Sequence, residues 1–182
     1  MDSSPLAGWD NFYVIVGSAA GGLTGLTFVV IALVRDGVNV RPTGLRAYVS
    51  PTMVHFGGVL ALAAYLSMPH QNISTVSAGL VLGGLAGVVY GIFTALSLRK
   101  TGTAAYTPVR EDWVWNVIMP TLVYLALCVM GFLIWYRPEQ TLFGVATLAL
   151  FLLFIGIRNA WDIAVFMTTK RGPDPPGSPG SG

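Results

Sequence analysis

Residues 141–169 read TLFGVATLALFLLFIGIRNAWDIAVFMTT, and this stretch decides what class of protein the chain can be. It is long enough to cross a bilayer as a helix, which takes about 20 apolar residues. Its apolar run nevertheless contains Arg158, Asn159 and Asp162. Ionisable groups are costly in hydrocarbon and usually face a bundle interior, a partner or water. Arg158 and Asp162 are four residues apart, so one helix face carries both and they can pair.

The composition of the whole chain places it in the membrane class. Of its 182 residues, 54% are hydrophobic and only 10% are charged, whereas soluble domains are about 25% charged. The net charge of +2 carries no nucleic-acid signal, because the basic residues are spread over short loops rather than gathered on one face. The single cysteine, Cys128, excludes an internal disulfide.

Five apolar stretches predict an all-α polytopic membrane protein, with one transmembrane domain over residues 1–169. The expected spans are about 12–34, 47–68, 73–98, 113–136 and 141–169. Tight polar turns at 69–72 and 137–140 would join the second span to the third and the fourth to the fifth. The Pro-, Gly- and Ser-rich tail at 170–182 is expected to be disordered.

Five spans put the two termini on opposite sides of the membrane, and the basic loops predict the orientation. One side would carry eight basic residues: Arg35, Arg41, Arg46, Arg99, Lys100, Arg110, Lys170 and Arg171. The other side would carry only Arg137. Because basic loops stay in the cytoplasm, we expect a bacterial inner-membrane protein with its N-terminus outside and its C-terminus inside. The N-terminus lacks the basic residues of a signal peptide.

Spans 2–3 and 4–5 read as two copies of one helical hairpin, preceded by an extra first helix. The sequence SPTMVH at 50–55 aligns with MPTLVY at 119–124, an offset of 69. The same offset relates Pro69 to Pro138, Gln71 to Gln140 and Gly87 to Gly156. Both hairpins would enter from the cytoplasm, so the repeat is parallel, about an axis along the membrane normal. Coincidence is the alternative, because prolines are common in membrane helices.

Glycines spaced by four residues predict close helix contacts in the first and third spans, because they form a flat stripe on a helix. They are Gly17, Gly21 and Gly25 in the first span, and Gly79, Gly83, Gly87 and Gly91 in the third. Both spans run in the same direction, so these two stripes could pack on each other.

Polar side chains gather in the cytoplasmic halves of the spans, and they predict a vestibule that is open to the cytoplasm and closed by an apolar outer half. The candidate residues are Arg158, Asp162, His55, Asn159, Asn116 and Tyr90. Others at similar depth include Thr52, Thr121 and Tyr124. Counted back from Thr169, Arg158 would lie about 16 Å deep. Its pair with Asp162 is a structural tie, a solute or ion site, or a docking face. His55 is a hydrogen-bonded core residue or a proton relay.

Motifs of catalysis are absent from the sequence. It contains no phosphate loop, no Cys or His pair at metal spacing and no serine nucleophile beside a base. We therefore expect no enzyme activity, no cofactor and no metal. Two functional classes remain: permeation of a small solute or ion, and a non-catalytic adaptor or regulator that binds membrane proteins. The expected partners are the lipid bilayer and either a second copy or another membrane protein.

Two short segments carry a resemblance to a known family. Phe12-Tyr13, the small-residue run Gly17–Gly22, the sequence GLTFV at 25–29 and Asn159-Ala160-Trp161 are the matching residues. They resemble small bacterial five-span proteins that are labelled as modulators of a membrane AAA protease. The resemblance implies a five-span inner-membrane protein that acts on other membrane proteins. It supplies no catalytic or binding residues.

Overall fold

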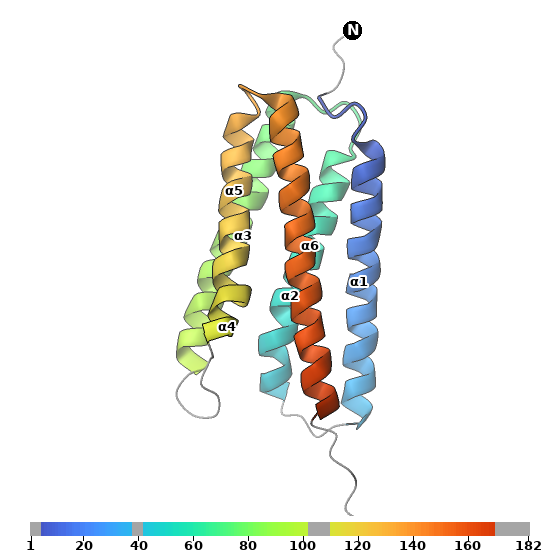
Figure 1. The fold of residues 1–182 in the computed structure, drawn as a ribbon, viewed down its shortest axis with the longest axis vertical. Coiled ribbons are helices and arrows are strands. Elements are labelled where there is room, and N and C mark those ends of the chain that lie inside the picture. Colours follow the sequence, from blue (N-terminus) through green and yellow to red (C-terminus); the bar gives the residue numbers. More distant parts are fainter. Residues whose placement is uncertain (1–4, 38–41, 102–109, 170–182) are drawn as a thin grey trace, which may run out of the picture.

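The computed structural model describes residues 5–37, 42–101 and 110–169, and these residues form helices and short turns, with no strand among them (Figure 1). The elements are α1 (Asp10–Gly37), α2 (Pro42–Leu66), α3 (Ile73–Thr101), α4 (Arg110–Trp113), the π-helix η1 (Val114–Ile118), α5 (Met119–Leu133) and α6 (Pro138–Thr169). The elements α4, η1 and α5 follow one another without a break. The predicted all-α class is confirmed, whereas the tail at 170–182 lies outside the described residues.

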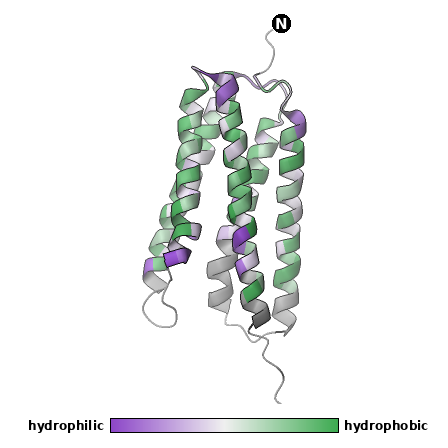
Figure 2. Ribbon diagram, in the orientation of Figure 1, coloured by the Kyte–Doolittle hydropathy of each residue, from purple (hydrophilic) through white to green (hydrophobic). Residues whose placement is uncertain are grey.

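Four helical segments of the described chain are long and apolar enough to cross a membrane. They are Asp10–Ala32, Ile73–Arg99, Val114–Leu133 and Pro138–Asp162. Helix α2 contributes a shorter apolar segment, Pro51–Leu66. Figure 2 shows the same pattern, with hydrophobic ribbon along the helices, hydrophilic ribbon near their ends and one hydrophilic interruption in the lower part of α6. These helices indicate an integral membrane protein, and they support four of the five predicted spans.

The helices lie side by side and are paired across the two predicted hairpins rather than within them. Helix α3 packs mainly on α5, and α2 packs on α1 and α6. The two hairpin contacts, α2 with α3 and α5 with α6, are smaller. The bundle therefore consists of an α3/α5 pair and an α1/α2/α6 group (Figure 1). The start of α1 and the end of α6 lie at opposite ends of the bundle, as an odd number of crossings requires.

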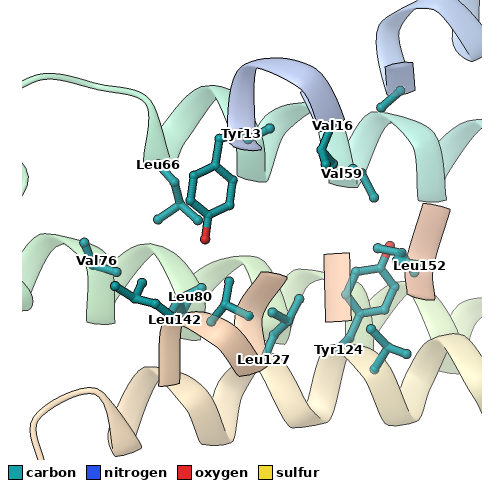
Figure 3. Close-up of a cluster of buried hydrophobic side chains, with 14 of the residues drawn as sticks. Tyr13, Val16, Val59, Leu66, Val76, Leu80, Tyr124, Leu127, Leu142 and Leu152 are labelled. Atoms are coloured by element: carbon teal, nitrogen blue, oxygen red, sulfur yellow. The ribbon is translucent and has the colours of Figure 1, made fainter. Parts of the chain in front are cut away.

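A buried apolar cluster joins the two groups. It includes Tyr13 of α1, Val59 and Leu66 of α2, Leu80 of α3, Leu127 of α5, and Leu142 and Leu152 of α6 (Figure 3). Lipid is as apolar as these side chains, so helix association in a membrane depends on close van der Waals packing rather than on the hydrophobic effect. The fit of small residues between the helices therefore decides how they pair.

The glycines of α3 provide such a fit against α5. An added Cβ would overlap the Tyr124 ring at Gly87 and the Thr121 side chain at Gly91, and at Gly84 it would lie 2.5 Å from Cys128 Sγ. Gly83 differs from the prediction, because no described atom lies within 4 Å of its Cβ position. Steps of four residues advance by about 40° around a helix with 3.6 residues per turn.

The stripe therefore rotates between neighbours as it runs along α3. Its first member, Gly79, faces the Tyr65 ring of α2, whereas Gly87 and Gly91 face α5. Gly83 falls between these two faces, and Gly84 takes its place in the α5 contact.

The glycines of α1 face α2. A Cβ at Gly17 would lie 3.0 Å from Ala63 Cβ, and one at Gly21 would lie 3.9 Å from Leu60 Cδ1. No described atom lies near the Cβ position of Gly25. The main partner of α1 is thus α2 and not the third span, because Ala63 and Leu60 of α2 lie opposite Gly17 and Gly21.

The two predicted turns differ in detail. In the first, His70 has a φ of 61°, and Gln71 Nε2 donates a hydrogen bond to the Tyr65 carbonyl oxygen at 2.7 Å. The second turn ends at Arg137 rather than at 140, because Pro138 already begins α6. Proline is well suited to the first helical position, where its missing N–H leaves no bond unmade.

Candidate functional site

The six candidate residues predicted from the sequence do not form one site. His55, Tyr90 and Asn159 belong to a polar region inside the bundle. Arg158 and Asp162 lie towards the outside of α6, with exposed side-chain fractions of 26% and 56%. Asn116 is half-buried on η1. The interior region and the charged pair are therefore described separately below.

The charged pair forms as its spacing predicts, and its side chains are partly exposed. Arg158 Nη1 is 3.0 Å from Asp162 Oδ2, and Arg158 Cζ lies 4.3 Å from the ring centre of Trp115. The candidate span of α6 ends at Asp162, although apolar residues follow it at 163–167, and the candidate span formed by η1 and α5 begins at Val114. Tryptophan is enriched at membrane interfaces, and arginine near a helix end extends towards the interface. The depth of Arg158 in the membrane, counted from Thr169, stays a prediction.

We expect single neutralisation of this pair to change stability only slightly. Surface ion pairs contribute about 0–1 kcal/mol, and an exposed cation–π contact adds about 0.5–1 kcal/mol. Arg158→Met and Asp162→Leu should each lower the free energy of unfolding in nanodiscs by about 1 kcal/mol or less. Arg137→Met, which removes an exposed hydrogen bond to Gln140, is the control. A loss of about 3–5 kcal/mol, as for a broken buried pair, would contradict this placement.

Seven residues make up the interior region, which we call the polar layer. They are Thr52 and His55 of α2, Tyr90 and Thr94 of α3, Thr121 and Tyr124 of α5, and Asn159 of α6. His55 is fully buried, and its Nδ1 lies 3.2 Å from the Tyr124 hydroxyl oxygen. The His55 ring centre lies 6.0 Å from that of Tyr124 and 6.4 Å from that of Tyr90.

Two glycines on different helices make room for Tyr124. Its ring occupies the space of a side chain at Gly87 of α3, and its hydroxyl lies 3.1 Å from the Cβ position of Gly58 on α2. The Tyr124 side chain therefore crosses from the α3/α5 pair to the α1/α2/α6 group (Figure 3). Glycine at both positions is required by this close approach.

Asn159 is placed at a similar level by the contact between α2 and α6. Gly156 packs on the Phe56 ring, where an added Cβ would lie 2.5 Å from Cε1. Asn159 is three residues after Gly156, and Thr52 is four residues before Phe56. The two helices are antiparallel (Figure 1), so these steps lead in the same direction along the bundle. Asn159 and Thr52 thus lie about one helical turn from the Phe56 contact.

Three polar atoms of this layer are buried without a hydrogen-bond partner among the described residues. They are His55 Nε2, Asn159 Nδ2 and Thr121 Oγ1. His55 and Asn159 are 0% and 5% exposed. A buried polar group without a partner costs about 1–3 kcal/mol, and in a native protein it is explained by strain, by a functional role, or by a water or ion that pairs with it.

Sequence reasoning counted Tyr124 among the polar residues at this depth but did not select it as a site candidate. The repeat offset of 69 residues could have identified Tyr124 as a site candidate, because it aligns Tyr124 with His55. One hollow on the described part of the chain lies elsewhere. It has a volume of about 400 Å³, and it lies between α1 and α2 beside Gly17, Gly21, Leu60 and Ala63. None of its lining residues belongs to the polar layer.

Among the described residues, no group of three or more His, Cys, Asp and Glu side chains could hold a metal ion. Comparisons of the chain with protein-family models, with curated proteins and with solved structures found no match. The resemblance to modulators of a membrane AAA protease thus stays an expectation. The function has to be argued from the polar layer and the charged pair.

Proposed function

We propose that this protein allows a small solute or ion to cross a bacterial inner membrane, and that the polar layer is its binding site. The observation that carries the proposal is the burial of His55 Nε2 and Asn159 Nδ2 without partners in one polar layer of a largely apolar bundle. Tyr13 Oη and Thr141 Oγ1 are also buried without partners, but they lie outside this layer. Polar groups in membrane helices are costly, and they often mark the path of a substrate or ion. The proposed site thus keeps His55 and Asn159 from the sequence candidates, adds Tyr124 and leaves out Arg158 and Asp162.

The proposal includes a fifth span and an orientation. Helix α2 has 25 residues and packs between α1 and α6, so it is well placed to cross the membrane with its neighbours. Arg99 and Arg110 belong to the end of the bundle opposite Arg137. Because basic loops are retained in the cytoplasm, the N-terminus is outside and the C-terminus inside.

An internal repeat is also part of the proposal. The offset of 69 relates His55 to Tyr124, Thr52 to Thr121, and Tyr90 to Asn159, all within the polar layer. The hydrogen bond between His55 and Tyr124 joins equivalent positions. Two residues at equivalent positions of two repeats can contact each other in this way only near a two-fold axis that relates the repeats. The α2–α6 and α3–α5 contacts are likewise equivalent under this offset. Transporters built from repeats commonly bind their substrates where the repeats meet.

Flux into proteoliposomes tests this function. Purified protein should raise the uptake of at least one member of a panel of ions and small metabolites above that of empty vesicles. His55→Leu should lower this uptake at least tenfold, because it removes the central polar side chain. His70→Gln is the matched control, since the other histidine lies exposed in the turn before α3. Uptake equal to that of empty vesicles, or unchanged uptake by His55→Leu, would contradict the proposal.

The alternative is an adaptor that binds another membrane protein or a second copy. One observation favours it: Trp161 is 69% exposed beside the exposed Asp162 on α6. A large aromatic residue next to a carboxylate is suited to a contact with a partner helix. Folded protein that gives no flux with any member of the panel would favour this second function.

A further inference from the structure

We infer that the polar layer binds a small uncharged molecule, and that Asn159 Nδ2 and His55 Nε2 donate hydrogen bonds to its acceptor atoms. This inference rests on the proposed function and specifies the class of solute. It follows from the hydrogen-bonding capacity of the buried groups and from the charges around them.

The first step concerns the direction of the hydrogen bond between His55 and Tyr124. The structure gives the Tyr124 hydroxyl no other acceptor among the described residues, so donation to His55 Nδ1 is the arrangement that leaves no O–H unpaired. A neutral imidazole that accepts at Nδ1 carries its proton on Nε2. His55 Nε2 is then a buried donor.

The second step concerns the complementarity of the ligand. Asn159 Nδ2 can only donate, and it is buried without a partner. Together with His55 Nε2 it presents two unused donors, and the Thr121 hydroxyl can act in either role. An oxygen of the carbonyl type, with two lone pairs, matches two donors.

The third step concerns charge. No Asp, Glu, Lys or Arg belongs to the polar layer, and the pair nearest in sequence, Arg158 with Asp162, is internally neutralised. The rings of Tyr90 and Tyr124 lie beside His55. Burial of an ion without a counter-charge is strongly unfavourable. The layer therefore favours a neutral molecule over an ion of the same shape.

Acetamide and acetate test this inference, because they have similar shapes and both carry acceptor oxygens, but only acetate is charged. The His70→Gln variant, labelled with ¹⁵N-histidine and placed in nanodiscs, has a single histidine signal set from His55. Acetamide should shift the His55 Nε2 resonance in a saturable way. Acetate at the same concentration should leave it unchanged. In Asn159→Leu the acetamide affinity should fall about tenfold, as expected when one hydrogen bond to a ligand is lost.

Several results would overturn the inference: no shift with acetamide, an equal or larger shift with acetate, or undiminished acetamide binding by Asn159→Leu. Asn159→Ala replaces that variant if Asn159→Leu does not elute as a monodisperse species. The outcome is separate from that of the flux experiment. A saturable acetamide shift without flux supports the binding site and contradicts permeation. Flux without an acetamide shift supports permeation and contradicts this ligand class.

Discussion

Gly87→Leu is expected to prevent the α3/α5 pair from forming. The Tyr124 ring occupies the space of any side chain at this position, so the two helices would have to move apart along their whole contact. Overpacking of a close contact costs about 1–3 kcal/mol when the neighbours can adjust. A full isobutyl group against an aromatic ring should exceed this range. We expect a large loss of monodisperse protein after purification and a lower midpoint of unfolding.

Gly83→Leu is the matched control for this prediction. It makes the same chemical change on the same helix, one turn away, where no described atom lies within 4 Å of the added Cβ. Its yield and unfolding midpoint should stay close to those of the unmodified protein. If both substitutions are tolerated equally, or both are equally damaging, the close contact at Gly87 does not determine helix pairing.

Tyr124→Ala should have the second large effect. The residue is only 5% exposed and connects Gly87 of α3 with His55 and Gly58 of α2. Replacing a large buried aromatic side chain by alanine typically costs about 3–5 kcal/mol. Tyr124→Phe keeps the ring and removes only the hydroxyl, which leaves His55 Nδ1 unpaired, at a cost of about 1–3 kcal/mol. Unfolding of both variants in the same detergent gives the comparison.

A control variant and a double-mutant cycle show whether burial of the ring or the hydrogen bond to His55 causes the loss of stability. Tyr136→Ala removes a tyrosine that is 85% exposed, so its unfolding should be almost unchanged. In a double-mutant cycle, Tyr124→Phe and His55→Leu should be clearly non-additive, because the two side chains share one hydrogen bond. Additive effects would show that the shared hydrogen bond contributes little. A loss for Tyr124→Phe as large as that for Tyr124→Ala would show instead that the packing of the ring contributes little.

The existence and direction of the helices could be predicted from the sequence because long apolar runs leave few alternatives in a membrane. The pair of Arg158 with Asp162 could also be predicted, because it depends only on spacing within one helix. The face on which this pair lies could not. In a membrane both the lipid-facing and the core-facing sides of a helix are apolar, so polarity alone does not show which side of α6 meets its neighbours.

The same limit applies to the glycines and to the candidate site. Spacing by four identified Gly87 and Gly91 as contact residues, but it also selected Gly83, because the sequence does not indicate where one neighbouring helix ends and the next begins. His55 and Asn159 were recognised from their polarity. Their separation from Arg158 depends on the rotation of each helix about its axis, and that rotation is set by packing across the bundle.

The packing of helices across the two predicted hairpins, rather than within them, has a consequence for biosynthesis. The ribosome releases α2 and α3 before α5 and α6. The main partner of α3 is α5, and α2 packs on α6 as well as on α1, so both early helices depend on helices that are made later. Gly84 and Gly87 of α3 therefore lack their contact partners on α5 until translation of α5 is complete. Assembly cannot finish before the last helix has inserted, so a nascent chain that stops after α3 would expose this surface to insertion factors and to quality-control proteases.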